Sequence, residues 1–384
     1  MRRLSFFIHS LAHLINDSYG GFLAPLLPLL AANHNLSLTT AGLLVTTQTL
    51  SASLFQPLWG WLSDRHPSRW YILGGIFAAG LFFSLMGVAP NLFVLVIMII
   101  VGGMGISCFH PMATALASNM TAKRKGLAIA FFITAGTAGY ALGPVFISCL
   151  VECAGLYWMP LAALPALIVI ILWHRFGPKD YSNLEIQEGV LRSKQRNAPV
   201  LNKPIVLLSA TSIIRAMVML VYVNFMSFYL QSFGLDLQTR SFYIFALQFG
   251  SSMGSLIGGG LSDRLGRWRV MFWTPLIGLP FLYLFLASQG FPALVFLFFA
   301  GFFVFASAPA VLVASQKIMF KREGLASALQ IGFAWGTAGL LMGPAGRVGE
   351  LLGIYQVLLL AGILPLIMCF LAIPLKKYRA QFEA

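Results

Sequence analysis

Four ionisable side chains lie inside long apolar stretches of this sequence, where a charge is costly and therefore points to a function. They are His13, Asp17, His110 and Arg215. A histidine beside a carboxylate can take up and release a proton at physiological pH, and His13 and Asp17 share one helix face at a spacing of four residues. Arginine keeps its charge and suits an anion. We therefore expect a proton site at Asp17, with His13 and His110 as neighbours, and anion binding at Arg215.

Each of these residues also has a purely structural interpretation. A permanent buried ion pair between Asp17 and Arg215 would need no transport function, and a buried imidazole of His13 or His110 often only bonds a carbonyl. His9 is expected at the membrane interface. If the ion pair is instead exchanged, protonation of Asp17 releases Arg215 to bind an anion, and loss of the anion restores the pair.

Three sequence motifs occur twice, in the same order, which indicates a duplicated unit of about half the chain. GTAGYALGP at 136–144 returns as GTAGLLMGP at 336–344, residues 60–65 match 259–264, and residues 123–128 match 321–326. Membrane proteins with such halves are predominantly transporters, with the substrate site at the repeat interface near the midplane. Asp17 and Arg215 then occupy matching positions of the first helix of each half.

Composition predicts a membrane protein. Hydrophobic residues make up 59% of the chain and charged residues 9%, whereas soluble domains carry roughly 25% charged residues. A membrane helix needs roughly 20 apolar residues. The expected fold is all-α, with 12 transmembrane helices in two six-helix bundles, at 1–175 and 204–384, joined by a cytoplasmic linker at 176–203. The twelve segments are about 5–30, 41–61, 70–88, 92–118, 126–151, 157–175, 204–233, 240–261, 270–289, 292–316, 324–347 and 353–375.

Basic residues set the orientation and exclude nucleic-acid binding. The net charge is +14, but the positive residues lie in short loops, and 22 of the 25 lie on one side of the predicted membrane. By the positive-inside rule both termini are cytoplasmic, in a bacterial-type inner membrane. The four cysteines show no metal or disulfide pattern. Without a phosphate-binding loop or a catalytic triad, we expect no enzyme, no cofactor and no metal.

The loops after the second and eighth segments carry the motif Gly-x-Leu-Ser-Asp-Arg, which resembles the cytoplasmic signature of the major facilitator superfamily. The resemblance covers essentially the full chain, although Pro67 replaces a glycine of the signature. The aspartate of such a turn is expected to meet a helix N-terminus or basic residues of the other half, and to release them on opening. The motif residues are Gly60, Asp64, Arg65 and Arg69, and Gly259, Asp263, Arg264 and Arg267.

The fifth segment resembles the corresponding helix of the superfamily's proton-driven exporters through Gly139, Gly143 and Pro144. Small residues let helices approach closely, and the proline bends the helix. Because the pattern recurs at 339–344, it indicates close helix packing as much as the direction of transport. Many drug–proton antiporters of the superfamily carry an arginine where this chain has Ile99, which weakens a general multidrug assignment.

A closer likeness is to the fosmidomycin-resistance branch, through His13 and Asp17, the prolines at 25 and 28, Phe109-His110-Pro111, and Arg215. The resemblance implies a proton-coupled exporter of a small polar or anionic compound that works by alternating access. Its partners would be the substrate, protons and lipid, and the chain would act as a monomer. The alternative is a proton symporter that imports a small organic anion or a metal chelate. Further candidate substrate contacts are Gln48, Tyr222 and Gln248.

Overall fold

The computed structural model of the chain describes residues 2–120, 125–178, 202–320 and 322–383, and every regular element within them is helical. The expected cytoplasmic linker at 176–203 lies mostly outside the described residues. So do most of the repeated basic residues at 123–125 and 321–322.

Each of the twelve expected segments is helical. The first half contains α1 (Arg2–Gly20) and α2 (Leu23–Asn33), α3 (Leu38–Leu54) and α4 (Gln56–Arg65), α5 (Trp70–Leu85) and η1 (Met86–Val88), α6 (Leu92–Asn119), α7 (Lys125–Ala154), and η2 (Leu156–Ala163) with α8 (Leu164–Phe176). The second contains α9 (Lys203–Gln231), α10 (Leu237–Leu265), α11 (Arg267–Leu286), α12 (Gly290–Ala306) and α13 (Ala308–Ile318), α14 (Glu323–Ala328) to α16 (Met342–Leu352) by way of η4 (Leu329–Phe333) and α15 (Ala334–Leu340), and α17 (Ile354–Gly362), α18 (Leu364–Leu375) and η5 (Lys376–Gln381).

Ten helical stretches of the described chain are long and apolar enough to cross a membrane. The first two expected segments are not among them, and each contains two helices. The first breaks between Gly20 and Leu23, and the second breaks at Phe55. The all-helical membrane fold is confirmed, and the count of twelve spans stays a prediction.

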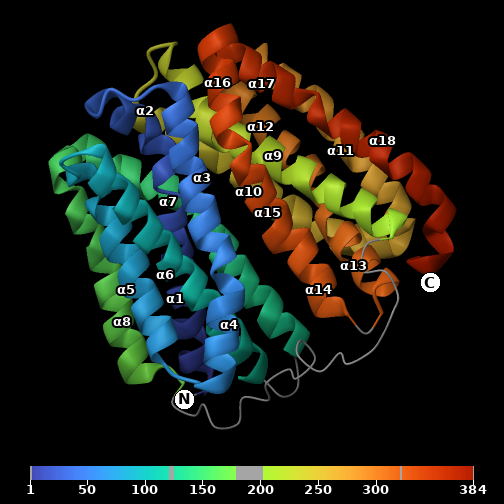
Figure 1. Cartoon of the computed structure of the whole chain (residues 1–384), viewed down its shortest axis with the longest axis horizontal. Helices are drawn as coiled ribbons and strands as arrows, with labels where there is room; N and C mark the ends of the chain where they lie inside the picture. Colours follow the sequence, from blue (N-terminus) through green and yellow to red (C-terminus); the bar gives the residue numbers. More distant parts are fainter. Residues whose placement is uncertain (1, 121–124, 179–201, 321, 384) are drawn as a thin grey trace. The chain divides into compact units, whose positions relative to one another are not determined.

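The described chain divides into two compact units (Figure 1). The first comprises Met1–Ile186 and Leu230–Phe245, and the second comprises Gln187–Tyr229 and Ala246–Ala384. In the first unit α1 packs against α5, α7 and α8, and α6 packs against α3 and α5. In the second unit α11 packs against α12 and α18. The start of α10 belongs to the first unit, where the hydroxyls of Ser148 and Ser241 share a hydrogen bond.

The glycines of α7 allow its backbone to lie directly against α1. A Cβ atom at Gly139 would overlap the carbonyl oxygen of Leu14, and one at Gly143 would overlap that of Ser18. No larger residue fits at either position without separating the two helices. In this half the motif therefore serves close packing, and it brings α7 next to the helix that carries His13 and Asp17.

A π-helical turn marks a difference between the two repeats. The residues at 123–128 recur 198 positions later, whereas those at 136–144 recur 200 positions later, so the second half has two additional residues between Ala326 and Gly336. The π-helical segment η4 lies in this interval. Because a π-helical turn contains more residues than an α-helical turn, η4 accommodates part of the addition without ending the helix.

Corresponding helices of the two halves begin with corresponding caps. Ser37 accepts a hydrogen bond from the backbone N–H of Thr40 at 3.2 Å, and Asp236 accepts one from that of Thr239 at 2.6 Å. The two capping residues are 199 positions apart in the sequence. A side-chain oxygen at this position satisfies an N–H that has no partner within the helix, so the repeat preserves the start of α3 and α10.

Candidate functional site

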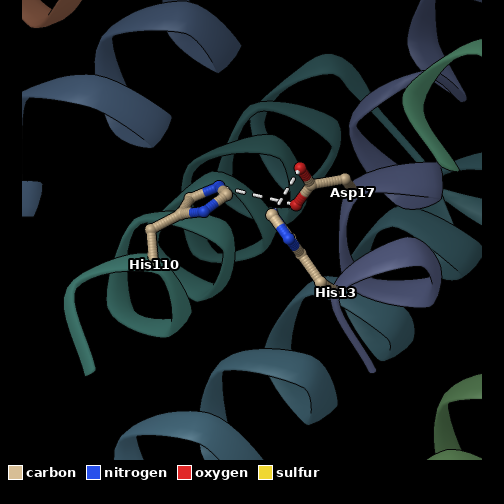
Figure 2. Close-up of side chains that lie close together, drawn as sticks. All are labelled: His13, Asp17 and His110. Atoms are coloured by element: carbon tan, nitrogen blue, oxygen red, sulfur yellow. Dashed lines mark ion pairs between the residues drawn. The ribbon is translucent and has the colours of Figure 1, made fainter. Parts of the chain in front are cut away.

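The structure brings together His13, Asp17 and His110, which we call the His–Asp cluster (Figure 2). His13 and Asp17 lie one turn apart on α1, and His110 reaches them from α6. Nε2 of His13 lies 3.1 Å from Oδ2 of Asp17, and Nε2 of His110 lies 3.5 Å from Oδ1. One carboxylate therefore faces two imidazoles, each at a different oxygen.

A backbone carbonyl determines how His13 faces Asp17. Nδ1 of His13 lies 2.8 Å from the carbonyl oxygen of Phe132 on α7. Because a carbonyl oxygen can only accept, Nδ1 must carry the hydrogen. A neutral His13 would then point the lone pair of Nε2 at a carboxylate oxygen 3.1 Å away. The contact is favourable only when a proton lies between them, on either the imidazole or the carboxyl group.

The His–Asp cluster is enclosed but not sealed. The side chains of His13, Asp17 and His110 are 7%, 16% and 26% exposed. Asn16 donates from Nδ2 to Oδ1 of Asp17 at 3.0 Å and orients the carboxylate. His110 retains the largest accessible fraction, so it is the member best placed to exchange protons with water.

The absence of a side chain at Gly136 leaves space for the His–Asp cluster. A Cβ atom there would overlap the imidazole of His13 and would lie 2.8 Å from Oδ2 of Asp17. The sequence drew attention to Gly139 and Gly143 in the same motif, but it did not connect Gly136 with the ionisable residues. That connection depends on how α7 is placed beside α1.

His9 is buried and bonded through both ring nitrogens, which favours a structural function, and its expected place at the membrane interface stays a prediction. Its side chain is fully buried, Nδ1 accepts from Nε1 of Trp173 at 3.1 Å, and Nε2 donates to the carbonyl oxygen of Ala113 at 2.8 Å. Both ring nitrogens are used by a neutral imidazole. Nothing in the sequence near His9 indicates these partners, because Trp173 and Ala113 come from α8 and α6.

In the second unit, a polar network surrounds Arg215, which is buried on α9. Its Nη2 donates to Ser212 at 3.1 Å, Ser212 donates to Oε1 of Gln330 at 2.7 Å, and Nε2 of Gln330 donates to Ser209 at 3.1 Å. The guanidinium also lies 5.7 Å from the centre of the Phe305 ring. Nη1 has no hydrogen-bond partner among the described residues. Gln330 was missed from sequence, although it is a polar residue in an apolar segment.

The three other candidate substrate contacts differ in their surroundings. The side chain of Gln248 is buried, and neither its oxygen nor its nitrogen has a partner among the described residues. Tyr222, by contrast, donates to the carbonyl oxygen of Leu358 at 3.0 Å, and Gln48 donates to that of Gly20 at 2.6 Å, where α1 ends. Buried polar atoms are normally paired, so Gln248 is the strongest of the three and the other two have structural bonds.

Comparison with known proteins identifies the family. The sequence model of the Major Facilitator Superfamily matches residues 9–344. This chain belongs to that superfamily. It is therefore a membrane transporter and not an enzyme, and the resemblance seen in the sequence motifs is confirmed.

Relatives within the superfamily include resistance proteins. The chain is 29% identical over 366 residues to the fosmidomycin resistance protein of Escherichia coli K12, covering 93% of this chain and 89% of that one. It is 23% identical over 378 residues to the uncharacterized transporter YfnC of Bacillus subtilis, covering 94% and 90%. A crystal structure of a bacterial homolog of the human lysosomal transporter Spinster matches with a TM-score of 0.79 and 14% identity, covering 100% and 98%. At that identity the likeness shows the fold alone.

The motif Gly-x-Leu-Ser-Asp-Arg has one contact in common between the two halves. A Cβ atom at Gly60 would lie 3.7 Å from Pro111, and one at Gly259 would lie 3.8 Å from Pro309. Matching glycines thus face matching prolines. The arginines of the first motif lie over tryptophan rings, Arg65 over Trp61 at 4.0 Å and Arg69 over Trp70 at 5.3 Å.

Within the second unit, the N-terminus of α11 is capped by a residue other than the motif aspartate, and the expected contact with the other half stays a prediction. Asp64 and Arg264 are exposed, and Asp263 lies 3.4 Å from Arg267 within the same unit. The N-terminus of α11 is instead capped by Glu383, whose carboxylate accepts from the backbone N–H of Arg267 at 2.8 Å and from that of the next residue at 2.9 Å. A carboxylate near the end of the chain therefore complements the positive end of the helix.

Proposed function

We propose that this transporter exports a small polar or anionic compound in exchange for protons, by alternating access. The observation that carries the proposal is the contact between His13 and Asp17. Its geometry requires a proton, because the carbonyl of Phe132 already engages the other ring nitrogen. A buried carboxyl–imidazole pair that must gain and lose one proton is a suitable coupling site.

Protons would reach this pair past His110, which is the most accessible member of the His–Asp cluster. Proton uptake gives either a neutral carboxyl–imidazole pair or an ion pair between Asp17 and His13. Proton release leaves the carboxylate of Asp17 facing the lone pair of Nε2 of His13. Because the second arrangement is unfavourable, the protonated and deprotonated transporter differ in the free energy of packing α1 against α6 and α7. That difference lets the proton bias one conformation over another.

The substrate would bind in the second unit at Arg215 and Gln248. Nη1 of Arg215 and both amide atoms of Gln248 are buried without partners among the described residues, so a ligand with oxyanion and polar groups would satisfy them. Gln330 and Ser212 hold the guanidinium in place. The predicted exchange of partners between Asp17 and Arg215, which are in different units, stays a prediction.

The topology proposed from sequence completes this function. We infer twelve spans in two bundles, 1–175 and 204–384, with a linker at 176–203 and both termini in the cytoplasm. The protein would act as a monomer in a bacterial-type inner membrane. Support comes from the basic residues that follow alternate segments, and from the two divided segments, each of which is helical on both sides of its break.

Export is favoured over import because one relative is named a fosmidomycin resistance protein, and a transporter that confers resistance removes the compound from the cell. Growth assays with small anionic toxicants, phosphonates among them, distinguish the two directions. Overexpression should raise resistance if the chain exports the compound, whereas hypersensitivity would favour the alternative, a proton symporter for a small organic anion or metal chelate.

Substrate-dependent proton flux in proteoliposomes tests the coupling. The compound identified in the growth assays should drive proton movement with the wild-type protein and not with Asp17→Asn. Asp236→Asn is the matched control, because it makes the same chemical change at an exposed helix cap. Normal pH-dependent flux in Asp17→Asn would show that the His–Asp cluster is not the coupling site.

A further inference from the structure

We propose that the His–Asp cluster is also a binding site for a divalent transition-metal ion such as Zn²⁺ or Co²⁺. One ligand atom each from His13, Asp17 and His110 can be chosen so that all three lie within 4.8 Å of one another. The sequence predicted no metal site, because these three side chains were assigned to proton coupling. The proposal goes beyond the transport function and stands on the geometry of these three side chains.

The distances within the cluster agree with those around a bound ion. Zinc bonds to imidazole nitrogen and carboxylate oxygen are about 2.0–2.2 Å long, and the usual geometry is tetrahedral. Two ligand atoms of such an ion are then about 3.4 Å apart. The distance from Nε2 of His13 to Oδ2 of Asp17 is 3.1 Å, that from Nε2 of His110 to Oδ1 is 3.5 Å, and the three ligand atoms lie within 4.8 Å of one another. Small side-chain movements would therefore bring all three ligands to one ion.

The hydrogen bonds made by His13 and Asp17 are of the kind that orient metal ligands in proteins. A histidine ligand almost always donates its other N–H to a carbonyl or carboxylate, which orients the ring. His13 donates from Nδ1 to Phe132 and so points Nε2 at the centre of the cluster. Asn16 donates to Asp17 and orients the carboxylate. Gly136 has no side chain to cover these ligand atoms.

The ligand set selects the class of ion. Two imidazoles and one carboxylate suit zinc, iron, cobalt, nickel or copper, whereas calcium and magnesium prefer oxygen ligands. Three protein ligands leave a position for water or for a group of the substrate. Because each ligand atom must be deprotonated to bind a metal, the ion and the shared proton occupy the same position. A bound ion would therefore inhibit transport, and this consequence rests on the proposed function. The binding of the ion rests only on the geometry of the three side chains.

Cobalt titration of the purified full-length protein in detergent tests the site. The background variant is Cys149→Ser with Cys153→Ser, because two exposed thiols one helical turn apart can bind added Co²⁺ and confuse the titration. We expect one Co²⁺ per chain with visible absorption bands that are displaced by Zn²⁺. Asp17→Asn and His110→Ala should each abolish these bands, and Asn16→Ala should weaken binding about 10–100-fold, as loss of an outer partner does elsewhere.

His66→Ala is the matched control, because it removes an exposed histidine outside the cluster and should leave the titration unchanged. The proposal is overturned if no ion binds to the background variant, or if Asp17→Asn and His110→Ala bind it as the background variant does. A rise in thermal stability with Zn²⁺ in the background variant, absent in the two ligand variants at equal yield, separates lost binding from misfolding. Metal binding without substrate-dependent proton flux would contradict the proposed function alone.

Discussion

Gly136 and Gly336 occupy the same position in a motif that occurs twice, yet they have different surroundings. A Cβ atom at Gly136 would overlap the imidazole of His13 and lie 2.8 Å from Asp17, whereas one at Gly336 would meet no atom within 4 Å. The repeated backbone therefore provides space for ionisable groups in one half and leaves the same position open in the other.

Gly136→Ala should impair coupling, because the imidazole of His13 must move away from its present contacts. We expect a fall of about tenfold or more in substrate-driven proton flux, since misplacing a functional group by about 1 Å can cost up to about 100-fold in enzymes. Gly336→Ala is the control in the repeat, and it should retain flux and thermal stability. Equal loss in the two variants would assign the effect to helix packing in general.

His9 and His13 should separate stability from coupling. His9→Ala leaves the buried N–H of Trp173 without its partner, at a cost of about 1–3 kcal/mol, and removes a second donor from the carbonyl of Ala113. We expect a lower melting temperature in detergent and an unchanged ratio of protons to substrate. His13→Ala should change that ratio. If instead His9→Ala alters the ratio at normal stability, its assignment as a structural residue is wrong.

Arg215 and Gln248 should determine substrate affinity. Hydrogen bonds to charged groups contribute about 1.5–3 kcal/mol, so Arg215→Ala should raise the KM for transport at least about tenfold. Gln248→Ala, which removes a neutral partner, should raise it less. Arg347→Ala is the control, because this exposed arginine pairs with Glu350 at 2.9 Å on the same helix. An unchanged KM in both buried-site variants would exclude substrate binding there.

Asp236 should make thermal stability depend on pH in acid. The hydrogen bond from the Thr239 backbone, together with that from its hydroxyl, lowers the pKa of Asp236 below its ordinary value. A lowered folded-state pKa stabilises the fold above the unfolded value of about 3.9, and this contribution is lost as pH falls through the folded value. The melting temperature of the wild type relative to Asp236→Asn should therefore fall between pH 6 and pH 3. A constant difference over that range would contradict the assignment. Ser37→Ala removes the matching cap, which does not ionise, so the difference in melting temperature between the wild type and this variant should stay constant over the same pH range.

The sequence by itself determined the class of protein and singled out the candidate positions. Long apolar runs require helices in a bilayer, because only a helix or a closed barrel satisfies the backbone there. Within those runs, Asp17, His13, His110 and Arg215 stood out because a membrane makes ionisable side chains costly. The duplicated motifs predicted that the halves correspond, and the paired caps and paired glycine–proline contacts recur at a displacement of 198 or 199 residues.

The tertiary structure alone decided which partner each polar atom has. His13 and Phe132 are 119 residues apart, and Ser212 and Gln330 are 118 residues apart. Periodicity indicates which face of a helix is buried, but it does not indicate which carbonyl or amide of another helix lies opposite. For that reason the sequence identified the members of the His–Asp cluster and missed Gly136 and Gln330. It also missed the hydrogen bonds of His9, because packing decides which groups lie opposite the two nitrogens of an imidazole.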